Sequence, residues 1–283
     1  ILFILRAPWV WPGADADWLA QTLGVWSSGH VQHPLAMALL GGIGRWLPPG
    51  QTVAGLNLAA VMLGGCTVAL LCAAVRTFLK AATQDPRSLP ALEPAMRAAS
   101  LTTAFALLLT PAFLRAGTHV QAQSVDLFLM AGSWLFTLRA LASFSPNRVL
   151  AASFFLGLTL PEAPTVGVLA IAAWLVLGIS AWRSDERFGV KSLIGRWLFP
   201  FGLGVTGTFA AAVLLGMAPG GAETVRAAAS GFARNWLAGV LSIQQGSWLL
   251  ISFFGVLPFV LALLLGRDIG NNRRSPAVLF TYV

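Results

Sequence analysis

Long apolar segments recur along this chain, and they restrict what it can fold into. They run for about 18 to 25 residues, the length that a helix needs to cross about 30 Å of hydrocarbon. A transmembrane barrel would alternate apolar and polar residues in short strands, and no such alternation occurs. Only 10% of the residues are charged, against about 25% in soluble domains. We therefore expect an all-α, polytopic bundle of transmembrane helices.

The apolar pattern also predicts the order of the segments. Residues 1–10 are expected to end a first span, and 11–53 to form an outer-face loop with a short interfacial or re-entrant helix at 35–46. Residues 218–247 are expected to form a second outer loop, in which TVRAAASGFARNWL is an amphipathic helix. The whole of 1–283 is interpreted as one transmembrane domain, a window of a longer chain. Further spans are predicted at 54–75, 98–114, 120–142, 149–160 with 163–182 (broken at Leu160-Pro161), 197–217 and 248–265, with another beginning near 277.

The basic residues are divided unevenly between the two sets of connections. Thirteen fall in one set and four in the other, with Arg6 in the first span, and the sets alternate with the predicted spans. The positive-inside rule places the richer set in the cytoplasm. Because this distribution explains the net charge of +8, no nucleic-acid partner is expected. The excess of Arg over Lys, with abundant Ala and Gly, favours a bacterial inner membrane. The loops expected to be cytoplasmic are 76–97, 143–148, 183–196 and 266–276.

Histidines and carboxylates gather at the opposite, outer face. Carboxylates there can act as a general base or bind a divalent cation, and Arg or protonated His can hold a phosphate group. Asp126 lies about two turns into an apolar span, where ionisable groups usually face a cavity or a partner. The outer-face group comprises Asp15, Asp17, His30, His33, His119, Asp126, Glu162 and Glu223.

Several short motifs follow one another in an order that is similar to the protein O-mannosyltransferase-like family of the GT-C glycosyltransferase superfamily. The resemblance covers roughly residues 1–180 and implies a GT-C-like bundle. It also implies an enzyme that transfers a sugar from a polyprenyl-phosphate donor to an acceptor on the outer face. The matching residues are Gly13, Asp15, Asp17, Leu23-Gly24-Val25, His33-Pro34-Leu35, Leu47-Pro48-Pro49-Gly50, Asn57-Leu58, Thr110-Pro111-Ala112-Phe113, His119, Asp126 and Gly157-Leu158-Thr159-Leu160.

The resemblance implies roles for individual residues. Asp15 or Asp17 would be the catalytic base, or would bind a divalent cation if one is used. Asp15 can also act as the N-cap of a helix starting at Ala16. Arg115 is a candidate phosphate contact. The chain departs from the family at Gln123-Ser124-Val125 and near Pro161-Glu162-Ala163, so a divergent or inactive homologue stays open. The substrate-binding candidates are His30, His33, Arg115, His119, Asp126 and Glu162.

Membrane lipid, a polyprenyl-phosphate-linked sugar and protein partners in a membrane complex are the expected partners. Two other functions also stay open. A non-catalytic transmembrane subunit is favoured by small-residue stretches such as 41–44 and 202–204, since small residues allow close helix packing. A transporter is favoured by the interrupted helices at Pro161 and by Asp126, although no internal repeat accompanies them.

Overall fold

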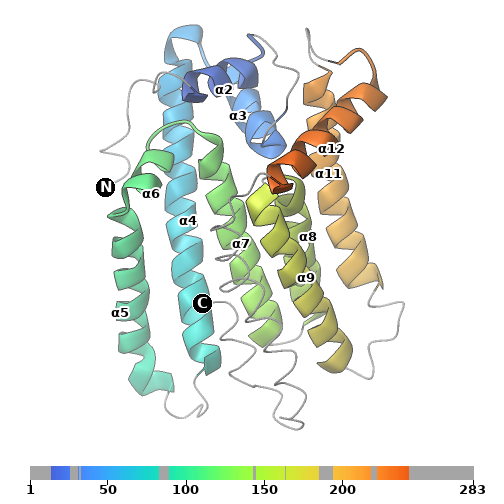
Figure 1. Ribbon diagram of the computed structural model, residues 1–283. Helices are drawn as coiled ribbons and strands as arrows, with labels where there is room; N and C mark the ends of the chain where they lie inside the picture. Colours follow the sequence, from blue (N-terminus) through green and yellow to red (C-terminus); the bar gives the residue numbers. More distant parts are fainter. Residues whose placement is uncertain are drawn as a thin grey trace.

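The computed structural model describes residues 14–25, 31, 33–82, 89–142, 145–162, 164–184, 194–217 and 222–241. Within these ranges the secondary structure is helical throughout, as predicted (Figure 1). Three of the helices are long and apolar enough to cross a membrane, namely Thr52–Lys80, Ala122–Ala142 and Ile194–Gly216. The predicted segments at 1–10, 248–265, 266–276 and from 277 lie outside the described residues.

The longer helices stand side by side, and shorter ones gather at one end of the bundle, the top in Figure 1. This upper layer contains α2 (Ala14–Thr22), α3 (Pro34–Trp46) and α12 (Val225–Leu241). The short helix predicted at 35–46 and the helix predicted at 224–237 are both confirmed. The other elements, in chain order, are η1 (Pro49–Gln51), α4 (Thr52–Ala82), α5 (Leu89–Leu108), α6 (Pro111–Ala116), α7 (Ala122–Ala142), α8 (Pro146–Glu162), α9 (Pro164–Ser184), the π-helical turn η3 (Ile194–Leu198) and α11 (Phe199–Gly216).

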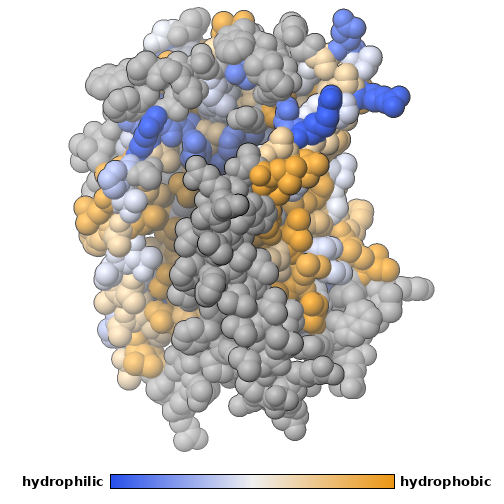
Figure 2. Space-filling view, viewed as in Figure 1, coloured by the Kyte–Doolittle hydropathy of each residue, from blue (hydrophilic) through white to orange (hydrophobic). Residues whose placement is uncertain are grey.

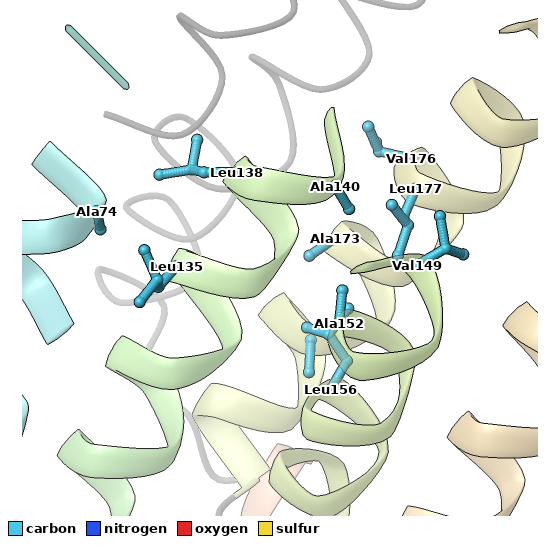
Figure 3. Close-up of a cluster of buried hydrophobic side chains, with 11 residues drawn as sticks. Ala74, Leu135, Leu138, Ala140, Val149, Ala152, Leu156, Ala173, Val176 and Leu177 are labelled. Atoms are coloured by element: carbon cyan, nitrogen blue, oxygen red, sulfur yellow. The ribbon is translucent and has the colours of Figure 1, made fainter. Parts of the chain in front are cut away.

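A buried apolar cluster joins α4, α7, α8 and α9 in the half of the bundle away from the upper layer (Figure 3). Leu135 and Leu138 enter it from α7, Leu156 from α8 and Leu177 from α9. Each has an exposed fraction of 4% or less. Together with Ala74 of α4, these side chains pack across four helices and fix the frame that carries the upper layer.

Helices α8 and α11 approach each other closely at two glycines. A Cβ atom at Gly204 would lie 2.6 Å from the Phe154 carbonyl oxygen, and one at Gly157 would clash with the Phe201 carbonyl oxygen. Next to this contact the Thr208 hydroxyl donates a hydrogen bond of 3.2 Å to the Leu158 carbonyl oxygen. Small residues thus let the two backbones meet, as is common between helices in membranes.

Three predicted boundaries are wrong. The span predicted at 98–114 is instead α5, which ends at Leu108, followed by α6 from Pro111. Thr110 is extended, as expected for a residue before proline. The break predicted at Leu160-Pro161 lies later, because α8 continues through Pro161 to Glu162. The predicted loop 76–97 is largely helical, since α4 runs to Ala82 and α5 begins at Leu89.

The surface is banded along the bundle. In Figure 2 hydrophilic side chains concentrate towards the end that carries the upper layer, and apolar side chains cover much of the described flanks below it. Exposed apolar residues on the flanks include Leu101 and Phe105 of α5 and Leu203 and Leu214 of α11. An apolar belt of this kind suits contact with lipid or with other membrane helices.

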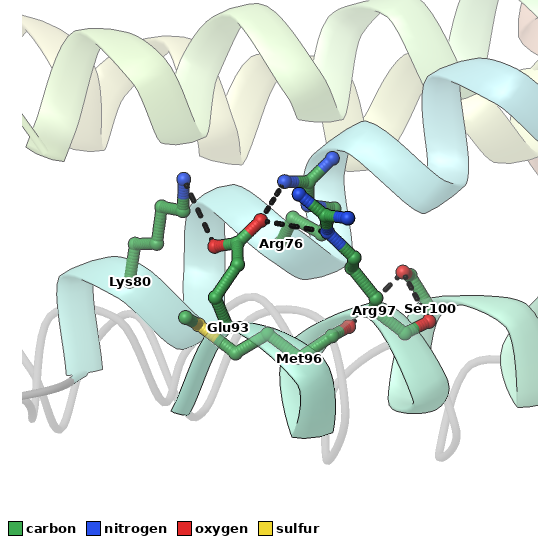
Figure 4. Close-up of polar contacts among 6 residues, drawn as sticks. All are labelled: Arg76, Lys80, Glu93, Met96, Arg97 and Ser100. Atoms are coloured by element: carbon green, nitrogen blue, oxygen red, sulfur yellow. Dashed lines mark hydrogen bonds and ion pairs between the residues drawn. The ribbon is translucent and has the colours of Figure 1, made fainter. Parts of the chain in front are cut away.

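A compact charged group ties α4 to α5 near the other end of the bundle (Figure 4). The Glu93 carboxylate of α5 accepts hydrogen bonds from the Arg76 guanidinium of α4 and, at 3.2 Å, from Arg97 Nε on its own helix. Lys80 Nζ lies 3.5 Å from the second Glu93 oxygen. One carboxylate therefore holds three cations at the junction of the two helices.

Candidate functional site

The start of helix α3 has an unusual local structure. His33 is its N-cap, with φ 55° and ψ 62°, the left-handed region. Among the described residues other than glycine, His33 alone has a positive φ. A side chain in this region costs roughly 1–2 kcal/mol, and the following Pro34 restricts the backbone further. His33 is therefore held in place by contacts outside its own segment.

Glu162 caps α3 from a distant part of the sequence. The first backbone N–H groups of a helix have no partner within it, and Pro34 has none to offer. The next two, those of Leu35 and Ala36, donate to the two oxygens of the Glu162 carboxylate at 2.7 and 2.8 Å. A carboxylate at this position is also favoured by the positive end of the helix dipole. Glu162, 3% exposed at the end of α8, thus fixes the start of α3.

Asp126 binds the His33 side chain. His33 Nδ1 lies 3.1 Å from Oδ1 and 3.0 Å from Oδ2 of Asp126, which lies near the start of α7. The His33 and Asp126 side chains are 22% and 12% exposed. Burial alone would lower the pKa of the His33 imidazole, but the hydrogen bond and charge of Asp126, with the charge of Glu162, raise it. The charged form of His33 is therefore favoured beside its two acidic neighbours.

The side chains of His33, Asp126 and Glu162 form one cluster, and the distances between their polar atoms limit the chemistry that it can perform. One ligand atom from each of His33, Asp126 and Glu162 lies within 4.8 Å of the others. The residues come from the start of α3, the start of α7 and the end of α8. Such a group can transfer a proton, bind a cation, or lock three elements together. The sequence placed all three residues among the substrate-binding candidates, and the structure brings these three together.

Helix α2 is carried by α3. A Cβ atom at Gly41 of α3 would clash with the Thr22 carbonyl oxygen, and one at Gly44 would lie 2.5 Å from Leu23 Cδ2. Leu19 of α2 packs with Leu40 of α3 in one buried apolar cluster. The position of α2 is thus tied to that of α3, and through it to the polar cluster.

Helix α2 contains the two aspartates expected to be catalytic. Both Asp15 and Asp17 lie within it, and their side chains are outside the described part of the structure. The N-cap role predicted for Asp15 is wrong, because the helix begins at Ala14. His30 also lies outside the described residues.

The remaining candidates lie around the turn between α6 and α7. Arg115 is in the last turn of α6 and is exposed. His119 Nδ1 lies 2.9 Å from the Thr118 hydroxyl oxygen. Neither belongs to the group formed by His33, Asp126 and Glu162.

Asn57 supports the same region and was given no role by the sequence. Its side chain is fully buried on α4, and its Oδ1 accepts the backbone N–H of Val120 at 2.7 Å. This bond fixes the segment that leads into α7, two residues before the helix begins. The signal available in the sequence was an amide inside a strongly apolar span, since buried polar groups are hydrogen-bonded.

Helix α12 packs beside the cluster as part of the upper layer. Trp236 Nε1 donates a hydrogen bond of 3.2 Å to the carbonyl oxygen of Leu160, two residues before Glu162. Trp236 also contacts Gly167 of α9, where a Cβ atom would lie 3.1 Å from the indole ring. The amphipathic helix predicted from the sequence therefore lies against the end of α8, which carries Glu162, and against the start of α9.

The three long apolar helices indicate a helical membrane protein, and its acid–histidine cluster is largely buried at the end of the bundle that carries the short helices. Comparisons with known proteins add no narrower assignment. No protein-family model matches the chain, and neither the curated proteins nor the solved structures give a match.

Proposed function

We propose that this protein is a membrane glycosyltransferase of the GT-C type. It transfers a sugar from a polyprenyl-phosphate donor to an acceptor at the outer face of the bacterial cytoplasmic membrane. In this proposal the upper layer faces outward, and the end that carries Arg76, Lys80 and Arg97 faces the cytoplasm. The positive-inside distribution of the basic residues supports that orientation.

The main support is the fixed position of α2. A short helix that carries Asp15 and Asp17 is packed on α3, and α3 is in turn bound by Glu162 through the backbone of Leu35 and Ala36. A general base must be held within hydrogen-bonding reach of its substrate, so an acidic segment at a membrane surface needs such an attachment. Asp15 or Asp17 is proposed as the base that accepts the proton of the acceptor hydroxyl.

The polar cluster has a positioning role in this proposal. His33, Asp126 and Glu162 hold the start of α3, and α3 holds α2 through Gly41 and Gly44. Arg115, exposed in the last turn of α6, is the proposed contact for the donor phosphate. Arg offers planar paired donors that suit a phosphate group.

The test is sugar transfer by purified protein in proteoliposomes, measured with a series of polyprenyl-phosphate sugars. Asp15→Asn, Asp17→Asn and the double variant remove the proposed base. Loss of a general base should lower the rate by about 10²–10⁴-fold. Glu223→Gln is the matched control, since Glu223 is an exposed acid just before α12. Unchanged transfer by the double variant would contradict this assignment.

A non-catalytic subunit of a membrane complex is the second candidate. The observation that favours it is the mutual pairing within the cluster: Glu162 is bound to two backbone N–H groups and Asp126 to His33. Such pairing is also what a purely structural lock requires. Purification of the tagged protein from its native membrane distinguishes the two. Stoichiometric partners together with absence of transfer in the wild type would support the subunit.

A further inference from the structure

We propose that His33, Asp126 and Glu162 form a binding site for a divalent transition-metal ion of the Zn²⁺ class. One ligand atom of each residue lies within 4.8 Å of the others. Imidazole nitrogen and carboxylate oxygen are ligands that Zn²⁺ takes in proteins. Hard cations such as Mg²⁺ favour oxygen ligands and keep several waters. The mixed nitrogen and oxygen set therefore indicates a transition metal.

The charges of the cluster favour a bound cation. Two carboxylates, 12% and 3% exposed, share a small space with one imidazole. The positive end of the α3 helix dipole offsets about half a charge of the Glu162 carboxylate. Excess negative charge in a largely buried site is unfavourable. A divalent ion would balance the charges of both carboxylates.

The three ligand atoms would have to move only a short distance to reach the spacing of a Zn²⁺ site. In a tetrahedral Zn²⁺ site the ligand atoms lie about 3.3 Å apart, given metal–ligand distances of about 2.0–2.1 Å. His33 Nδ1 and the Asp126 oxygens are already 3.0–3.1 Å apart. The widest separation in the group, at most 4.8 Å, would have to close by roughly 1.5 Å. The Glu162 oxygens keep lone pairs beyond those used by Leu35 and Ala36, so coordination is compatible with the helix cap.

Three protein ligands leave room for a fourth. Catalytic Zn²⁺ sites typically combine three protein ligands with one exchangeable position. That position could accept an oxygen of the donor phosphate, a role that rests on the proposed function. Metal binding itself does not depend on it, because it follows from the three side chains alone.

The experiment is a Co²⁺ titration of the full chain purified in detergent and stripped of metal. The wild type should bind one Co²⁺ per chain, with the visible absorption of a low-coordinate site. Zn²⁺ should displace the Co²⁺, and excess Mg²⁺ should not. Asp126→Asn keeps an oxygen that can accept from His33 but loses the charged ligand, so its Kd should rise at least about tenfold. Glu223→Gln should bind as the wild type does.

Each other outcome overturns the proposal. These outcomes are absence of the Co²⁺ spectrum in the wild type, an unchanged Kd in Asp126→Asn, or an equal loss in Glu223→Gln. If Asp126→Asn does not fold, His33→Asn provides the second variant, and retention of Co²⁺ with unchanged spectrum there would also contradict the site. Sugar transfer is not part of the measurement. Loss of metal binding with intact transfer would therefore reject the metal site and leave the proposed function standing.

Discussion

The carboxylate of Glu162 accepts the backbone N–H of Leu35 at 2.7 Å, although 127 positions separate the two residues. Glu162 ends α8 and Leu35 lies in the first turn of α3. The bond therefore joins the bundle to its upper layer. Since α2 is packed on α3, the position of the proposed catalytic aspartates depends on this contact.

Removal of the Glu162 carboxylate should destabilise the protein. Glu162→Ala leaves the N–H groups of Leu35 and Ala36 without their acceptor, and each such buried group costs about 1–3 kcal/mol. We expect a loss of roughly 2–4 kcal/mol, measured by unfolding in mixed micelles with increasing SDS. Glu162→Gln keeps one acceptor oxygen and should lose about half as much.

Glu223→Gln serves as the control for this series. Glu223 is exposed, so its substitution should stay within about 0.5 kcal/mol of the wild type. If Glu162→Ala unfolds at the same SDS fraction as Glu223→Gln, the cap does not contribute to stability.

The backbone conformation of His33 gives a second prediction, which concerns whether an alanine or a glycine variant at this position is more stable. His33→Ala and His33→Gly both lose the bond to Asp126. At an ordinary position Ala is more stable than Gly, because Gly loses more conformational freedom on folding. At φ 55° the order should reverse, with Gly more stable by about 1 kcal/mol. Thermal unfolding of the two variants in detergent measures it, and a more stable Ala variant would show that position 33 is not held in the left-handed region.

Much of the fold could be predicted from the sequence, because apolar length is a direct signal. The span at 120–142 and the short helix at 35–46 follow from it. The break at Pro111 was not predicted, although a proline disfavours continuation of the preceding helix. Apolar residues extend across that proline, which is why a span was predicted at 98–114.

The three residues of the polar cluster were named as candidates from the sequence, but the contacts between them could not be predicted. Asp126 attracts attention because ionisable groups are rare in apolar spans, and Glu162 was grouped with the other acids expected at the outer face. Their meeting at His33 depends on how α3, α7 and α8 pack, and residues 33 and 126 are 93 positions apart. The role of the Leu35 and Ala36 amides could not be inferred at all, since backbone groups carry no sequence signal. Asn57 was visible as a buried amide, but its partner Val120 was not.

The contact between α8 and α11 gives a third prediction, with controls on the same helix. Gly204→Ala places a methyl group against the Phe154 carbonyl oxygen and the Leu158 amide nitrogen, at 2.6 and 2.7 Å. Overpacking of this kind typically costs 1–3 kcal/mol. Gly202→Ala and Gly207→Ala add the same group where nothing lies within 4 Å, and their higher helix propensity should raise stability by up to about 1 kcal/mol. SDS unfolding of the three variants should separate Gly204 from the others, and equal behaviour would contradict the close approach.

The charged group around Glu93 predicts a dependence on pH. The hydrogen bond from Arg97 lowers the pKa of Glu93 most; burial opposes this shift, and the charges of Arg76 and Lys80 lower the pKa further. Because the unfolded state binds the proton more readily, the stabilisation is complete above the ordinary pKa of 4.5 and is lost as the pH falls through the lower folded value. The thermal midpoint of the wild type should therefore exceed that of Glu93→Gln at pH 7, and the two should converge as the pH falls below 4.5.

Salt provides an independent check on this Glu93 prediction. At 1 M NaCl the Debye length falls to about 3 Å, so the difference between wild type and Glu93→Gln at pH 7 should shrink. Arg97→Gln removes the bond that lowers the Glu93 pKa most, and it should shift the loss of stabilisation to higher pH. A difference between wild type and Glu93→Gln that stays constant from pH 7 to pH 3 and from low to high salt would show that Glu93 does not join α4 to α5 through its charge.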